Sequence, residues 1–166
     1  LKQLQALADA FASIPKPSAS DARALESIRS RIALVGRMSE ADLDSFLTAT
    51  GRMGIAQRAL AQGKTEGAVE ALQAFIQEME KLGDRAPQLL ARTALSDLFY
   101  KRGRLDEARA QFEAKLALER ELGYRMGELG SLSGIAEIHR LQARYDDSLK
   151  QTEAALEIAV EIGDRV

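Results

Sequence analysis

A 40-residue repeat is the sequence feature that most constrains how this chain can fold. Two sets of short motifs recur at this interval, and each set contains a glycine or alanine followed by a polar residue or tyrosine. The first set is Lys81-Leu82-Gly83-Asp84-Arg85, Glu121-Leu122-Gly123-Tyr124-Arg125 and Glu161-Ile162-Gly163-Asp164-Arg165, and the second is Gly63-Lys64, Gly103-Arg104 and Ala143-Arg144. Two markers in phase are typical of proteins that stack one small unit on the next.

Each repeat predicts two helices. Apolar residues between the two kinds of marker are spaced by three and four, as on one face of a helix: Val69, Leu72, Phe75, Ile76, Met79 and Leu82. Gly83, Gly123 and Gly163 follow such stripes, and we expect each to end its helix in the left-handed conformation. Aromatic residues make up 5% of the chain, and no segment alternates like a strand. The predicted fold class is all-α.

The repeat also predicts the organisation of the chain. Three helix pairs are expected at about 39–83, 84–123 and 124–163, and Ser39-Glu40-Ala41-Asp42 resembles a capping box at the start of the first pair. An earlier helical pair in 1–38, interrupted near Pro15, is expected to be a degenerate repeat or an end cap. The total is about eight helices. The segment 163–166 resembles the start of a further unit, so we expect the native protein to continue.

The repeats resemble the tetratricopeptide repeat family in a 40-residue form. The resemblance is carried by equivalent residues in three units: 55–59, 63–68 and Leu72; 95–99, 103–108 and Phe112; 135–139 and 143–148. It implies a right-handed α-solenoid of antiparallel helix pairs, with Ala68, Ala108 and Ser148 where the two helices of a pair cross. Three residues depart from the family pattern: Arg52 and Arg92 stand at a large apolar position, and Thr152 stands in the Leu72 column.

Composition and charge exclude several classes of function. The chain has 23 basic and 25 acidic residues, a net charge of -2, so it lacks the positive field that nucleic-acid binding requires. It has no cysteine and one histidine, His139, so we expect no metal and no cofactor. The sequence contains neither a membrane-spanning run nor a signal peptide, and a leader removed before Leu1 is left as an alternative. We expect a cytoplasmic protein.

Motifs that suggest catalysis have simpler structural interpretations. Gly63-Lys64-Thr65 resembles the end of a phosphate-binding loop, but Arg58 stands where that loop needs glycine. Gly130-Ser131-Leu132-Ser133-Gly134 lacks the central serine of a nucleophile elbow. We therefore predict no enzyme. His139 is expected to pack in a core column, and the glycines of its helix indicate either close helix packing or room for a ligand backbone. The charged residues Glu113, Glu119 and Arg120 are expected on a solvated outer face.

The resemblance places function in a concave groove lined by the first helix of each pair. The residues that it assigns to this groove are Gln57, Thr93, Asp97, Tyr100, Lys101, Ser133, Glu137 and Arg140. Family members that clamp a C-terminal carboxylate use lysine and asparagine there, whereas this chain has no asparagine. A carboxylate clamp is therefore not expected. Asp97 and Glu137 share one repeat column, so their carboxylates could meet basic side chains three residues apart, and we expect an interaction scaffold that binds a basic or amide-rich peptide. Arg140 has two roles open to it, binding a ligand carboxylate or pairing with Glu137.

Two further expectations concern partners. The alternative function is a sensor or regulatory module of a larger bacterial signalling or transcription regulator, which binds a signal peptide or a small ligand. The last helix would expose Leu149, Leu156 and Ile162 at an uncapped end, and exposed apolar patches of this kind usually find a cover. A homodimer through this end is therefore expected.

Overall fold

The structure is a computed structural model that describes residues 38–163 and isolated positions before them. Within these residues the chain forms six helices and no strand: α3 (Glu40–Ala61), α4 (Thr65–Lys81), α5 (Ala86–Lys101), α6 (Leu105–Glu121), α7 (Arg125–Leu141) and α8 (Tyr145–Gly163). The predicted all-α class is confirmed. The N-terminal helical pair expected over 1–38 falls almost entirely outside the described residues.

The chain divides into two compact units, Leu1–Thr48 and Ala49–Val166, and the boundary falls inside α3. In the first unit, the start of α3 forms the predicted capping box. The Ser39 hydroxyl accepts a hydrogen bond from the Asp42 amide at 3.2 Å, and the Asp42 carboxylate accepts one from the Ser39 amide at 3.2 Å. Two amides that the helix leaves without partners are thereby satisfied.

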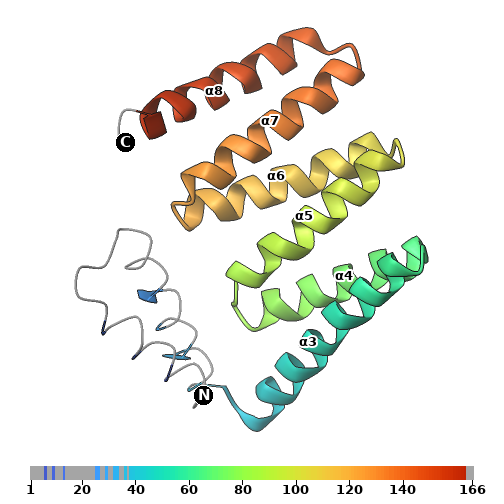
Figure 1. Ribbon diagram of the computed structural model, residues 1–166, viewed down its shortest axis with the longest axis vertical. Coiled ribbons are helices and arrows are strands. Elements are labelled where there is room, and N and C mark those ends of the chain that lie inside the picture. The colour runs from blue at the N-terminus through green and yellow to red at the C-terminus, as the bar shows by residue number, and fades with distance from the viewer. Residues whose placement is uncertain are drawn as a thin grey trace. The chain divides into compact units, whose positions relative to one another are not determined.

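In the second unit, successive helices are packing neighbours. Contacts join α4 to α5, α5 to α6, α6 to α7 and α7 to α8, and Figure 1 shows α5 to α8 running back and forth. The small residues of one repeat column are wholly or partly buried. Ala68 and Ala108 are completely buried, and Ser148 is half-buried.

The turns show that the sequence period is also a backbone period. Gly63, Gly83, Gly103 and Gly123 have φ between 64° and 71°, and Ala143 takes the same left-handed conformation with φ 58°. The amide after each turn residue donates to a carbonyl five positions earlier, which closes the helix end. These bonds measure 2.8 Å for Lys64 to Ala59, 2.9 Å for Arg104 to Phe99 and 2.8 Å for Arg144 to His139.

Gly163 does not follow the predicted pattern. It is the last residue of α8 and lacks the positive φ of the other glycines, so the expected left-handed ending is wrong there. Glycine permits that conformation without requiring it.

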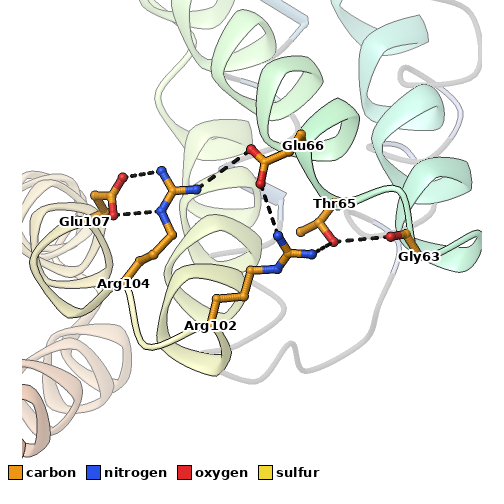
Figure 2. Close-up of polar contacts among 6 residues, drawn as sticks. All are labelled: Gly63, Thr65, Glu66, Arg102, Arg104 and Glu107. Atoms are coloured by element: carbon orange, nitrogen blue, oxygen red, sulfur yellow. Dashed lines mark hydrogen bonds and ion pairs between the residues drawn. The ribbon is translucent and has the colours of Figure 1, made fainter.

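Polar contacts between consecutive helix pairs repeat with the same period. Arg102, in the turn after α5, donates to the Glu66 carboxylate at 3.1 Å and to the Thr65 hydroxyl, as Figure 2 shows. One repeat later, Gln142 donates to Asp106 at 3.0 Å. The turn after α5 therefore contacts the start of α4, and the turn after α7 contacts the start of α6.

The core at the C-terminal end of the second unit lies among α6, α7 and α8. Leu116, Leu132, Ile135, Ala155 and Ile158 are buried there, and Ile162 packs against them. The expectation that Ile162 is exposed is therefore wrong, because its side chain faces this cluster. Exposed apolar residues on α8 are instead Leu149, Leu156 and Val160, with 58%, 62% and 54% of their surface accessible.

Arg92 is a charged residue at a largely buried position between helices. Its side chain is 13% exposed, so the stem is packed among the helices. The guanidinium bridges Glu80 on α4 at 2.7 Å and Gln111 on α6 at 3.3 Å. Arg92 therefore joins three helices.

Candidate functional site

The structure places most of the predicted groove residues on α5 and α7. We call this surface the α5–α7 face and define it by Thr93, Asp97, Tyr100, Lys101, Ser133, Glu137 and Arg140. Thr93 and Glu137 are half-buried and the other members are exposed. Gln57 lies on α3 and is exposed, and among the described residues no hydrogen bond joins it to this face.

Glu137 is the centre of the contacts on this face. Its carboxylate accepts two hydrogen bonds of 2.7 Å from the Arg140 guanidinium and one of 3.4 Å from the Tyr100 hydroxyl. The hydrogen bonds from Arg140 and its positive charge lower the pKa of the Glu137 carboxyl. The same hydrogen bonds and the negative charge of Glu137 raise the pKa of Arg140. Glu137 therefore stays ionised. Of the two roles expected for Arg140, the structure shows the ion pair with Glu137 within α7.

Asp97 differs from Glu137 although both occupy the same repeat column. It is exposed on α5, and within residues 38–163 it makes no hydrogen bond or ion pair through its carboxylate. Its negative charge is therefore available to a ligand, whereas that of Glu137 is largely balanced by Arg140.

The two hydroxyl residues of the face bind their own helices. Thr93 donates to the Leu89 carbonyl at 2.8 Å, and Ser133 donates to the Leu129 carbonyl at 2.8 Å. Because the donor is used, each hydroxyl presents its lone pairs outward, and the face offers acceptors at these two positions.

A hollow of about 240 Å³ continues the face onto α8. It is lined by Ser133, Ala136, Glu137, Arg140, Ser148, Thr152 and Ala155. The residues of α8 were not predicted here, because the family resemblance assigns first helices alone to the groove. Forty residues earlier, the equivalent surface is where α7 packs: Phe112, the counterpart of Thr152, lies against Gly134. The α7–α8 hollow is thus the counterpart of a helix-binding surface.

A buried polar network between α6 and α7 was not predicted either. Glu119 is completely buried, and its carboxylate lies 3.2 Å from the Lys115 amine and accepts a 2.6 Å hydrogen bond from Ser131. The expectation that Glu119 is solvated is wrong, although Glu113 and Arg120 are exposed. The repeat columns carry the signal, because Phe75 and Met79 are buried at the positions of Lys115 and Glu119.

Glycines of α7 explain how the helices approach closely. A β-carbon on Gly127 would stand 2.5 Å from the Glu119 carboxylate, and one on Gly134 would stand 2.7 Å from the Phe112 ring. Close packing is therefore confirmed at these two positions. Gly130 has open space instead.

His139 packs in the core column that the repeat predicts. It is 8% exposed, and its Nδ1 atom has no hydrogen-bond partner among the described residues. Burial is the main cause that lowers its pKa, and the positive charge of Arg144 lowers it further. Near neutral pH the folded protein therefore favours the uncharged imidazole.

No protein-family model matches this chain, and the search of curated proteins finds no match. Across the described residues, no helix is both long enough and apolar enough to cross a membrane. The same residues contain no group of three or more acidic or histidine side chains placed to hold a metal ion.

Proposed function

We propose that this protein is a non-catalytic interaction scaffold that binds a peptide on the α5–α7 face. The observation that carries the proposal is the Tyr100–Glu137 contact, which brings an exposed tyrosine on α5 and a half-buried glutamate on α7 together at 3.4 Å. The proposed architecture is a right-handed solenoid of the tetratricopeptide type. The recurring turns and inter-pair contacts support it, because they repeat the same turn geometry and the same kind of polar contact every 40 residues.

The chemistry of the face favours a basic or amide-rich peptide. Asp97 offers a carboxylate that no ion pair or hydrogen bond holds among the described residues, while Thr93 and Ser133 offer hydroxyl lone pairs. The contact between the Tyr100 hydroxyl and the Glu137 carboxylate brings side chains of α5 and α7 within reach of one ligand. An extended peptide advances about 3.3 Å per residue, so peptide side chains three residues apart are separated by about 10 Å and can contact both helices. Tyr100 is 37% exposed and supplies a rigid aromatic surface beside them.

The α7–α8 hollow adds a place for one side chain of the peptide. Its volume of about 240 Å³ suits a single residue, and the hydroxyl-bearing residues Ser148 and Thr152 lie opposite the Glu137–Arg140 pair. An amide side chain can donate to these acceptors and accept from Arg140. We therefore place glutamine or asparagine of the ligand in this hollow.

The test uses fluorescein-labelled ten-residue peptides in which every third residue is lysine, glutamine or glutamate and the others are alanine and serine. Fluorescence anisotropy should show the tightest binding for the lysine peptide, weaker binding for the glutamine peptide and the weakest for the glutamate peptide. The double variant Asp97→Arg, Glu137→Arg should weaken binding of the lysine peptide at least tenfold while circular dichroism shows retained helicity.

A matched charge reversal on second helices serves as the control. Glu70 on α4 and Glu157 on α8 are exposed and have no ion-pair partner among the described residues. Reversing both to arginine makes the same change in net charge away from the face. Equal losses in the two double variants would show that only net charge matters, and this outcome would refute the α5–α7 site.

A further inference from the structure

A second hollow lies between the end of α3 and the start of α4, away from the α5–α7 face. Its volume is about 340 Å³, and it is lined by Ile55, Arg58, Ala59, Gln62, Lys64 and Gly67. We call it the α3–α4 hollow. Arg58 and Lys64 are exposed at its rim, and neither makes an ion pair among the residues that the structure describes. An apolar floor with two unbalanced cations sets the chemistry of this surface.

The repeat columns show what is different about this hollow. Ala59 stands where the next two helix pairs have Phe99 and His139, and Gly67 stands where they have Glu107 and Asp147. The backbone is the same in all three turns, as the closing hydrogen bonds of 2.8 to 2.9 Å show. The α3–α4 pair therefore lacks one ring and one carboxylate relative to its neighbours.

The following helix pair shows how that ring and that carboxylate are used. Phe99 is 3% exposed, and the Arg104 guanidinium lies over its ring, 4.6 Å from the centroid. The Glu107 carboxylate holds the same guanidinium through two hydrogen bonds, as Figure 2 shows. Ring, cation and carboxylate form one assembly, with the cation between two attractive partners.

The α3–α4 pair retains only the cation of this assembly. Lys64 occupies the Arg104 position, but Ala59 places a methyl group where a ring would lie beneath it. Gly67 offers no acid to hold Lys64, and a β-carbon built on Gly67 would meet nothing within 4 Å. The empty space above Ala59 and the unpaired cation of Lys64 could both be occupied by one molecule that has a ring and a carboxylate.

We propose that the α3–α4 hollow binds a small aromatic carboxylate. The ring takes the position that Phe99 occupies in the next pair, against Ile55 and Ala59 and beneath Lys64. The carboxylate takes the position of the Glu107 carboxylate and pairs with Lys64 and Arg58. The volume lies at the lower end of the range of small-molecule sites, which fits a ligand of this size.

The test is a titration of the full chain with 3-phenylpropionate, followed by ¹H–¹⁵N NMR shifts of the Ala59 and Gly67 amides. A ligand of this size is expected to bind with a Kd on the order of 1 mM. The alcohol 3-phenylpropanol, which keeps the ring and lacks the charge, should bind at least fivefold more weakly.

Two variants supply the missing groups from within the chain. Ala59→Phe should place a ring in the hollow, as Phe99 does, and abolish binding without lowering the unfolding midpoint. Gly67→Glu should hold Lys64 and weaken binding at least fivefold. Ala61→Phe is the matched control, because Ala61 is exposed on α3 and does not line the hollow.

The proposal is overturned if the full chain shows no saturable shift of the two amides. It is equally overturned if Ala59→Phe binds 3-phenylpropionate as the parent protein does. Binding of the alcohol and the acid with equal affinity would remove the proposed role of Lys64 and Arg58. None of these outcomes depends on peptide binding at the α5–α7 face, so the two proposals stand or fail separately.

Discussion

The ring of Phe112 on α6 occupies the space into which a β-carbon on Gly134 of α7 would project, with a separation of only 2.7 Å. This contact sets the distance between α6 and α7, and α7 supplies Glu137 and Arg140 to the α5–α7 face. Gly134→Ala is expected to lower the free energy of unfolding by about 1 to 3 kcal/mol, because overpacking outweighs the better helix propensity of alanine.

Gly130→Ala is the control on the same helix. A β-carbon on Gly130 would meet no atom of a neighbouring helix within 4 Å, so alanine should raise stability by up to about 1 kcal/mol. Urea denaturation followed by circular dichroism measures both variants. Equal effects of the two substitutions would contradict the close contact at Gly134.

Removing one partner of the Lys115–Glu119 pair should lower the free energy of unfolding much more than replacing both partners. Lys115→Met leaves the buried Glu119 carboxylate without its cation, and we expect a loss of about 3 to 5 kcal/mol. The double variant Lys115→Met, Glu119→Met should recover most of this loss, because it removes the buried charge and the preceding repeat is apolar in both columns; the Ser131 hydroxyl, which loses its acceptor, accounts for the remainder. A double-mutant cycle measures the coupling, and additive effects would show that the pair is not buried.

Ala143 has a left-handed backbone conformation, and the equivalent positions of the two preceding repeats, Gly63 and Gly103, are glycine. Ala143→Gly should therefore raise the free energy of unfolding by about 0.5 to 1 kcal/mol, since the strain of a side chain at φ 58° exceeds the entropy gained by glycine in the unfolded chain. The reverse change Gly103→Ala should lower it by about 1 kcal/mol. Chemical denaturation of the two variants checks both signs.

His139 should make stability depend on pH below neutrality. Its folded pKa is lowered by burial and by Arg144, so the unfolded chain, with a histidine pKa of roughly 6.5, binds a proton more readily. The histidine contribution to stability is complete above that value and is lost as the pH falls toward the folded pKa. The urea midpoint should decrease from pH 7.5 to 5.5, and His139→Phe, which copies Phe99, should remove part of that decrease. An identical decrease in the variant would exclude His139 as a source.

The exposed apolar residues of α8 predict self-association. Sedimentation at high concentration should show a dimer that Leu156→Glu, Val160→Glu converts to a monomer, because both side chains are more than half exposed. Glu70→Arg, a charge change on α4, should leave the dimer intact. A parent protein that stays monomeric would contradict this prediction.

Turn geometry and part of the candidate site follow from local sequence. Gly63, Gly83, Gly103 and Gly123 take the left-handed conformation because the choice depends on one residue and the bonds that close the helix before it. The 40-residue spacing of Asp97 and Glu137 likewise predicts equivalent positions on α5 and α7, and the Tyr100 hydroxyl contacts Glu137 between these two helices. Helix periodicity and turn chemistry are local, so the sequence determined them by itself.

Tertiary structure decided which polar groups are buried and which charges are already paired. The pattern of its own helix predicts Glu119 at the surface, yet α7 covers it because Gly127 and Ser131 lie above its carboxylate. Ile162 turns inward, and Arg140 pairs with Glu137, for reasons that depend on neighbouring helices and on the rotamers of long side chains. Whether a side chain is buried depends on the helix that packs against it, and the periodic pattern of one helix does not specify that neighbour.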